Sequence, residues 1–434
     1  MKNKLCEFNE YTLKNVNIVD VENDKIIEGQ NVSIKDGIIT YIGKENQKTT
    51  KEIDCEGKYL SPGLINLHVH LFGSGKPSKT VNGNGNSQEK LVSFIKTKLG
   101  NVVLNAIVKS NLKAALLSGT TTLRSVGDFL YSDVKQRDLI NASKYPGPRL
   151  LCSGPAITIK GGHGDGTISL HAGSKEEFEK LVQDNISHKV DLIKIMITGG
   201  VMDAKKKGEP GELRMNKENT AWVCDYAHSL GFKVAAHVES SKGVEVALEG
   251  GVDTIEHAAS LTPMMVKMFK EKGKIITTTI SPAVPYAELN ENLTHCTADQ
   301  KYNAKIVSDG IISAAKTALK EGITIGLGTD ASCPYAFHYD MWRELVYFTK
   351  YVNATNEFAV KSATLINAGI IGLDNEIGSI KDGKCADLVL LKENPYENLR
   401  NYSLPLMVVY KGKIIKNPSV KRNKYFENIL DTLL

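Results

Sequence analysis

The stretch Ser61-Pro62-Gly63-Leu64-Ile65-Asn66-Leu67-His68-Val69-His70 is an apolar run that ends in two histidines separated by one residue. Side chains alternate across a β-strand, so residues two apart point to the same side. A strand here would aim the imidazoles of His68 and His70 at one point beyond its C-terminal end. Imidazole is a common ligand of zinc and similar divalent metals. The pair therefore predicts part of a metal site, whose other ligands must come from later strands.

Beyond this run, the middle of the chain alternates strand-like and helix-like segments. Seven more strands are expected at residues 120–125, 149–153, 192–197, 233–237, 254–257, 275–280 and 324–328, with helical stretches such as 89–117, 175–188, 217–230 and 301–320 between them. Eight β/α repeats over roughly 300 residues predict an α/β fold of the (β/α)8 TIM barrel type. A doubly wound open sheet is the alternative, but no glycine-rich dinucleotide motif follows an early strand.

Both ends of the chain are rich in short β-like runs. They lie at residues 13–19, 31–34, 38–42 and 58–60, and again at 386–391 and 406–415, with Asp36-Gly37 predicting a hairpin between two of the first runs. The simplest arrangement joins the two ends into one small β-sandwich domain. We therefore expect this domain at residues 1–60 and 379–434, with the barrel at 61–378.

Composition narrows the function classes. With 434 residues, 41% hydrophobic content and a net charge of +5, the chain is typical of a globular protein with one large and one smaller domain. Its basic residues are scattered, which argues against nucleic-acid binding, and no apolar run approaches a membrane span. The first 15 residues lack the apolar core of a signal peptide. Seven widely spaced cysteines without a CxxC pair favour reduced thiols in a cytoplasmic protein.

Barrel enzymes gather their catalytic groups at the C-terminal ends of the strands, and four further strand ends here carry ligand-type residues. These are Lys194, His237, His257 and Asp330. Each has an ordinary explanation when taken alone: a hydrogen-bonded histidine, a lysine reaching the barrel rim, or an aspartate capping the next helix. Their joint position beside His68 and His70 favours a metal site.

Lys194 lies in an apolar strand, where an ammonium group beside divalent cations would be unfavourable. Carbamylation by carbon dioxide would convert the amine into an anion that can bridge two metals as a carboxylate does. Our hypothesis is that Lys194 is modified in this way.

Two features of the chain resemble the amidohydrolase superfamily. One is the order HxH, Lys, His, His, Asp on successive strands, and the other is the stretch Gly378-Ser379-Ile380-Lys381-Asp382-Gly383-Lys384-Cys385-Ala386-Asp387-Leu388-Val389. Within that superfamily the chain is similar to imidazolonepropionase-like, prolidase-type metal-dependent dipeptidases, through the segments 119–124, 161–165 and 194–202. Such members cleave Xaa-Pro or Xaa-Arg/Lys dipeptides or N-acyl amino acids, and homo-oligomers are common among them.

The resemblance implies a binuclear centre, with zinc as the expected metal. His68, His70 and Asp330 would hold the more buried ion, His237 and His257 the other, and carbamylated Lys194 would bridge both. Two metals about 3.5–4 Å apart can share a hydroxide and activate it at neutral pH. Asp330 would then act as general base and acid on a small amide substrate.

Two other interpretations remain open. The same centre could hydrolyse a cyclic amide, lactone, carbamate or phosphoester, or the chain could be a non-enzymatic scaffold. The intact ligand set argues against the scaffold.

Three residues are candidates for substrate contacts. His163 lies in a glycine-rich loop and could hydrogen-bond a substrate carbonyl or carboxylate, or have no special partner. Arg124 could bind a carboxylate bidentately, or pair internally with Asp128. The loop at 198–216 is expected to overhang the barrel mouth, and Arg214 within it would favour an anionic substrate group. Prolidase-type members often place an aromatic residue and a serine at this point, where this chain has Arg214-Met215-Asn216.

Overall fold

The computed structural model describes residues 3–77 and 86–434, and the chain divides into two compact units. One unit consists of Met1–Asn66, Leu112–Leu123 and Tyr339–Asn423, and the other of Leu67–Asn111, Arg124–His338 and Lys424–Leu434. The domain boundaries at residues 60 and 378 stay a prediction. Within the described residues, no helix has the length and apolarity needed to span a bilayer.

All eight expected barrel strands are present. Three form one sheet in the order β6 (Leu64–Val69), β7 (Thr120–Ser125) and β8 (Arg149–Cys152). The other five follow two short strands in a second sheet, in the order β10 (Ser169–His171), β9 (Ala156–Thr158), β11 (Ile193–Met196), β12 (Val234–Val238), β13 (Thr254–His257), β14 (Ile275–Thr278) and β15 (Ile325–Leu327). A parallel bridge between Val69 and Ala331 closes the ring on one side, and Asp191 N donates to Cys152 O on the other.

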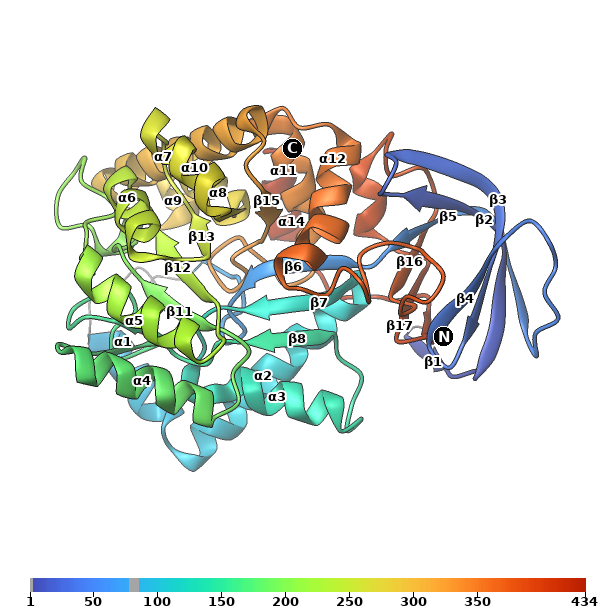
Figure 1. The fold of residues 1–434 in the computed structure, drawn as a ribbon, viewed down its shortest axis with the longest axis horizontal. Helices are drawn as coiled ribbons and strands as arrows, with labels where there is room; N and C mark the ends of the chain where they lie inside the picture. The colour runs from blue at the N-terminus through green and yellow to red at the C-terminus, as the bar shows by residue number, and fades with distance from the viewer. Residues whose placement is uncertain (1–2, 78–85) are drawn as a thin grey trace. The chain divides into compact units, whose positions relative to one another are not determined.

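Strands such as β11, β12 and β13 are buried along their whole length, which explains their near-continuous apolar sequences, whereas β10 is partly exposed. Helices alternate with the strands (Figure 1), at α1 (Asn86–Ile95), α2 (Lys98–Leu117), α3 (Ser132–Asn141), α4 (Lys175–Ser187), α5 (Lys217–Ser229), α6 (Ser241–Gly250), α7 (Pro263–Lys272), α8 (Ile280–Glu288), α9 (Glu291–Thr294) and α10 (Ala298–Glu321). The second unit also includes α14 (Lys424–Asp431), which follows the last strand of the chain. The helical stretch expected at 89–117 is two helices, because Thr97 Oγ1 accepts from Gly100 N and caps a new start.

The first unit contains a sheet built from both ends of the chain, as expected. Its strands form one continuous sheet in the order β1 (Lys4–Cys6), β18 (Lys413–Lys416), β17 (Met407–Tyr410), β16 (Leu388–Leu391), β5 (Glu52–Pro62), β2 (Glu10–Asp20), β3 (Lys25–Lys35) and β4 (Ile38–Gly43). Antiparallel pairing of β5 with β16 joins the two ends. The expected Asp36-Gly37 hairpin turn is present, with positive φ angles of 51° and 83°.

The side chains that form the core of this sheet are apolar and buried. Fully buried side chains from the N-terminal strands, such as Leu13 and Leu60, pack with those of the C-terminal strands, such as Leu388 and Val409. The first unit also includes the helices α11 (Met341–Val352), α12 (Asn356–Lys361) and α13 (Asn367–Ile370). The residues discussed below all belong to the second unit.

Candidate metal centre

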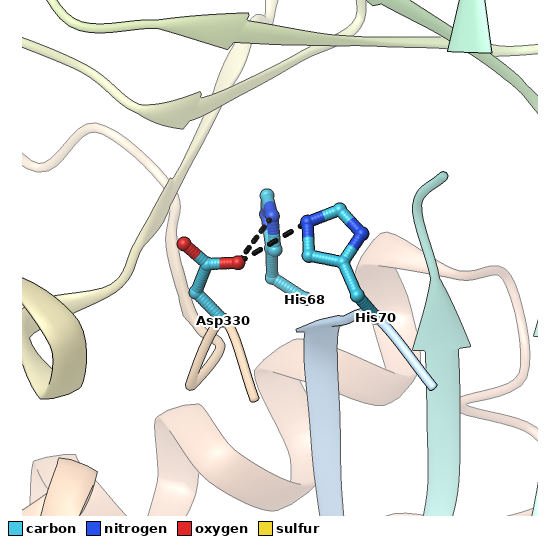
Figure 2. Close-up of side chains that lie close together, drawn as sticks. All are labelled: His68, His70 and Asp330. Carbon is cyan, nitrogen blue, oxygen red and sulfur yellow. Dashed lines mark ion pairs between the residues drawn. The ribbon is translucent and has the colours of Figure 1, made fainter. Parts of the chain in front are cut away.

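Three ligand-type side chains meet where the ring of strands closes. His68 is in β6, His70 lies just beyond that strand, and Asp330 follows β15. Figure 2 shows the Asp330 carboxylate facing both imidazoles. Its Oδ1 lies 3.2 Å from His70 Nε2 and 3.5 Å from His68 Nε2. The three donor atoms lie within 4.8 Å of one another, which is close enough for one metal ion.

In both His68 and His70, the second ring nitrogen, Nδ1, is hydrogen-bonded within the protein. His68 Nδ1 donates to Glu256 Oε2 at 2.8 Å, and His70 Nδ1 donates to the carbonyl oxygen of Gly127 at 2.7 Å. Both rings therefore present Nε2 toward Asp330. Hydrogen bonds of this kind fix the tautomer and the orientation of histidines that bind metals.

A second group of possible ligands faces the same cavity. It consists of His237 and Glu239 from the end of β12 and His257 from the end of β13, again with donor atoms within 4.8 Å. His257 Nδ1 is hydrogen-bonded to Thr279 Oγ1 at 2.6 Å. The centroid of the His257 ring lies 4.7 Å from the centroid of the His68 ring and 4.7 Å from that of the His237 ring. The two groups of possible metal ligands are therefore adjacent.

Lys194 is completely buried and lines this cavity from β11. Its Nζ has no hydrogen-bond partner in the structure, and neither have His237 Nε2 and Glu239 Oε2. Buried polar groups in folded proteins are nearly always paired, so three unpaired donor atoms around one cavity need an explanation. Divalent cations at this position would supply the missing partners of His237 and Glu239, whereas the amine of Lys194 would have to lose its positive charge to lie beside them.

The protonation states also suit metal binding. Burial lowers the pKa of His68 to about 4, and burial holds the pKa values of His237 and His257 well below the ordinary value. Burial alone would raise the pKa of Asp330, but the neighbouring His68 and His70 hold it well below its ordinary value. Neutral imidazoles and an ionised carboxylate are the forms that bind metals. Burial lowers the pKa of Lys194 to about 8.

Two of these residues have strained backbones. His257 and Asp330 adopt positive φ angles of 66° and 51°, in the left-handed region that side chains other than glycine rarely occupy. Each such residue costs about 1–3 kcal/mol, and such strain is concentrated at functional sites. Here it turns the chain at the ends of β13 and β15, where the two ligands lie.

Arg124 does not line the cavity. The residue is 4% exposed. Its guanidinium donates to both carboxylate oxygens of Glu256, at 2.8 and 3.0 Å, while its Nε donates to Leu67 O. Asp128, the alternative partner expected from the sequence, instead accepts from Leu71 N and Ser125 Oγ. Arg124 and Glu256 thus form a buried pair directly behind His68.

The cavity has a volume of 440 Å³ and includes His163 in its lining. The His163 ring stacks on that of His237, with centroids 4.4 Å apart and planes 8° apart, and its Nδ1 is hydrogen-bonded to Asp203. Residues 200–203 of the loop at 198–216 also line the cavity. Arg214 does not: it pairs with Glu212 at 3.1 Å.

Sequence reasoning missed two carboxylates. Glu239 stands two residues after His237, so the alternation that linked His68 to His70 also predicts that Glu239 faces the same side. Glu256 is adjacent to His257, and no local pattern marks it. Its role depends on partners more than 130 residues away in the sequence.

Comparisons with known proteins agree with this geometry. A model described as the amidohydrolase family matches residues 59–415. Ochratoxinase from Aspergillus niger is 26% identical over 423 residues, covering 89% of this chain and 83% of the relative. A structure assigned as a prolidase from Bifidobacterium longum has a TM-score of 0.85 and 33% identity, covering 98% of both chains. A Xaa-Pro dipeptidase structure with methionine bound in its active site has a TM-score of 0.82 and 25% identity, covering 94% of this chain and all of that one.

Proposed function

The chain belongs to the amidohydrolase family and is a metal-dependent hydrolase of carbon–nitrogen bonds, and we propose that it cleaves the amide bond of a dipeptide or an N-acyl amino acid at a two-metal centre. The observation that carries this proposal is the pair of adjacent ligand groups around the buried Lys194. His68, His70 and Asp330 would hold one ion, and His237 and His257 the other.

Lys194 would bridge the two ions as a carbamate. Because its pKa is lowered to about 8, part of the amine is neutral near neutral pH, and only the neutral amine reacts with carbon dioxide. A nitrogen–carbon bond then forms and one proton leaves the nitrogen, so the side chain becomes an anion. This change also removes a buried positive charge that would repel the metals.

When bound, divalent cations, which we propose are zinc, would polarise the substrate carbonyl and acidify water. Asp330 is ionised and faces the cavity, so its carboxylate can take a proton from the attacking water. It would then return that proton to the nitrogen of the leaving group. His163, on the cavity wall beside His237, would hydrogen-bond the substrate carboxylate or carbonyl.

The relatives support an amide substrate. They are named for ochratoxin, Xaa-Pro and prolidase activities, and one structure holds an amino acid in its active site. An amino-acid product would fit this cavity, because His163 lies beside the proposed metal ligand His237 and could hydrogen-bond the product carboxylate.

A panel of dipeptides and N-acyl amino acids, incubated with the full chain, zinc and bicarbonate, tests the proposal. We expect hydrolysis of at least one class and close to two zinc ions bound per chain. Lys194→Gln should lower both the metal content and the dependence of activity on bicarbonate. A metal-replete protein that cleaves none of these amides, but opens lactones or phosphoesters, would show that the proposed substrate class is wrong.

A further inference from the structure

We propose that the substrate has one large, uncharged apolar arm that lies against helices α1 and α2, and that these two helices determine specificity. The inference rests on the proposed amide hydrolysis and adds the chemistry of the group attached to the amide. It comes from the distribution of charge and apolar surface around the cavity.

One wall of the cavity is formed by aliphatic and aromatic side chains of α1 and α2. Leu91, Phe94, Val103 and Ile107 all line the cavity, and they remain 49%, 41%, 40% and 38% exposed. Contiguous apolar surface that stays open to solvent beside a catalytic centre is typical of a ligand-binding wall. Val92, Ile95 and Leu104 extend the same wall.

Other parts of the cavity lining are apolar as well. They are formed by Pro282, Ala283 and Tyr286 of α8 and by Ala304, Val307 and Ile311 of α10. The metal-binding residues instead come from the strand ends. A substrate whose amide lies at the strand ends would therefore extend its remaining atoms between apolar helices.

The charges of the lining disfavour an anionic arm on this wall. Lys194 is the one lysine or arginine among the described lining residues, and it belongs to the metal-binding floor. Arg124 and Arg214, the two arginines expected to read an anion, are engaged with Glu256 and Glu212 instead. The other lining residues with a carboxyl group, besides Asp330, are Asp203 and Glu239. An acidic arm would find no lysine or arginine on the wall. An uncharged apolar arm would instead be favoured, because binding would remove apolar surface of both the arm and the wall from water.

Two series of substrates measure this preference. In one, the acyl chain of an N-acyl methionine is lengthened from acetyl to octanoyl, and in the other the amino-acid side chain of an N-acetyl amino acid is lengthened. We expect kcat/KM to rise about fourfold per added methylene group in one series, as burial of apolar surface predicts. A terminal carboxylate on the lengthened arm should abolish the gain.

Adjacent valines on α2 provide a matched pair of variants. Val103 lines the cavity, whereas Val102 is 66% exposed and does not. Val103→Asp should remove most of the chain-length dependence, measured as the ratio of kcat/KM for the octanoyl substrate to that for the acetyl substrate within the same variant. Val102→Asp should leave the dependence intact. Calorimetric binding of octanamide against acetamide, in the wild type and both variants, gives the same comparison without turnover.

The outcomes separate this inference from the proposed function. If the acetyl substrate is cleaved but neither series shows a rise, the apolar arm is wrong and amide hydrolysis stands. If no amide is cleaved, the proposed function fails, and the octanamide titration alone decides whether the wall binds apolar groups. If Val102→Asp acts as strongly as Val103→Asp, α2 contributes through packing or through contact between copies of the chain, and the wall assignment is overturned.

Discussion

Glu256 controls the orientation of His68 although it does not line the cavity. Its carboxylate accepts from His68 Nδ1 and from Arg124, and Arg124 also holds Leu67 O in the same strand as His68. Burial alone would raise the pKa of Glu256, but Arg124 and His68 lower it well below the ordinary value, so this carboxylate is ionised. The pair thus acts on the metal through His68.

Replacing that carboxylate should weaken metal binding. Glu256→Gln keeps the size of the side chain but removes the charge that both partners need. We expect an affinity for the ion at His68 lower by about 10- to 100-fold, the usual effect of losing such a partner. Competition with a fluorescent zinc chelator measures it. Glu245→Gln, in an exposed pair with Lys242, is the control and should not change the affinity. Equal affinities in all three proteins would contradict the role of Glu256.

Asp330 has a different role, because it is close to both imidazoles and to the cavity. Asp330→Asn keeps an oxygen donor but cannot take a proton, so we expect the variant to bind metal yet lose about 10²- to 10⁴-fold in kcat. Metal content and steady-state rates on the same preparation check this. Near-normal turnover in a metal-replete variant would exclude Asp330 as the general base.

Single residues differ in how far sequence predicts them. His68, His70, His237 and His257 follow from strand alternation and from the rule that barrel sites lie at strand ends. Arg124 satisfies the same rule, being near the end of β7, yet its guanidinium is buried against Glu256. A pattern of local spacing fixes which side of a strand a residue faces. It does not fix whether a long side chain reaches the cavity or finds a partner across the barrel.

At the scale of elements, strands were predicted more accurately than breaks between helices. Every barrel strand was found within a few residues, since buried parallel strands have continuous apolar sequences bounded by turns. The extra strands β9 and β10 are three residues each and too short for a periodic pattern. The break between α1 and α2 is set by the Thr97 cap inside a segment of unbroken helical pattern.

Asp253 ties several elements together at the start of β13. Its carboxylate accepts from Val234 N at 2.8 Å, His228 Nε2 at 2.8 Å and Lys274 Nζ at 3.1 Å. Partial burial alone would raise its pKa, but the hydrogen bonds from Val234 and His228 and the charge of Lys274 lower it below the ordinary value. Because the unfolded state binds the proton more readily, the carboxylate stabilises the fold above about pH 4, and this contribution is lost as the pH falls further.

Asp253→Asn should therefore lower the free energy of unfolding by about 1–2 kcal/mol at pH 7, with a smaller difference from the wild type at pH 3. Urea denaturation at several pH values measures this. Asp309→Asn removes an exposed partner of Lys305 and should have little effect at any pH. A penalty for Asp253→Asn that stays constant down to pH 3 would mean that the loss comes from packing rather than from charge.

For the whole molecule, the barrel holds several unfavourable features in one place. His257 and Asp330 have left-handed backbones, Lys194 is a buried amine, and five imidazoles approach one another within a single cavity. Such features persist only where the surrounding structure or a ligand compensates for them. Closure of the strand ring supports the backbone, and bound cations would compensate for the donor atoms.

Removal of metal should consequently destabilise the protein as well as inactivate it. A ligand that binds only the folded state at 100 times its dissociation constant adds about 2.7 kcal/mol to the free energy of unfolding. We expect chelation to lower the melting temperature by several degrees and zinc to restore it. His237→Asn should show a smaller zinc response, because one ligand group is incomplete. His188→Asn changes an exposed histidine that does not line the cavity and should respond as the wild type does. If chelation abolishes activity without any change in melting temperature, the metals do not compensate for the strained and unpaired groups, and the folded barrel maintains them by its own packing.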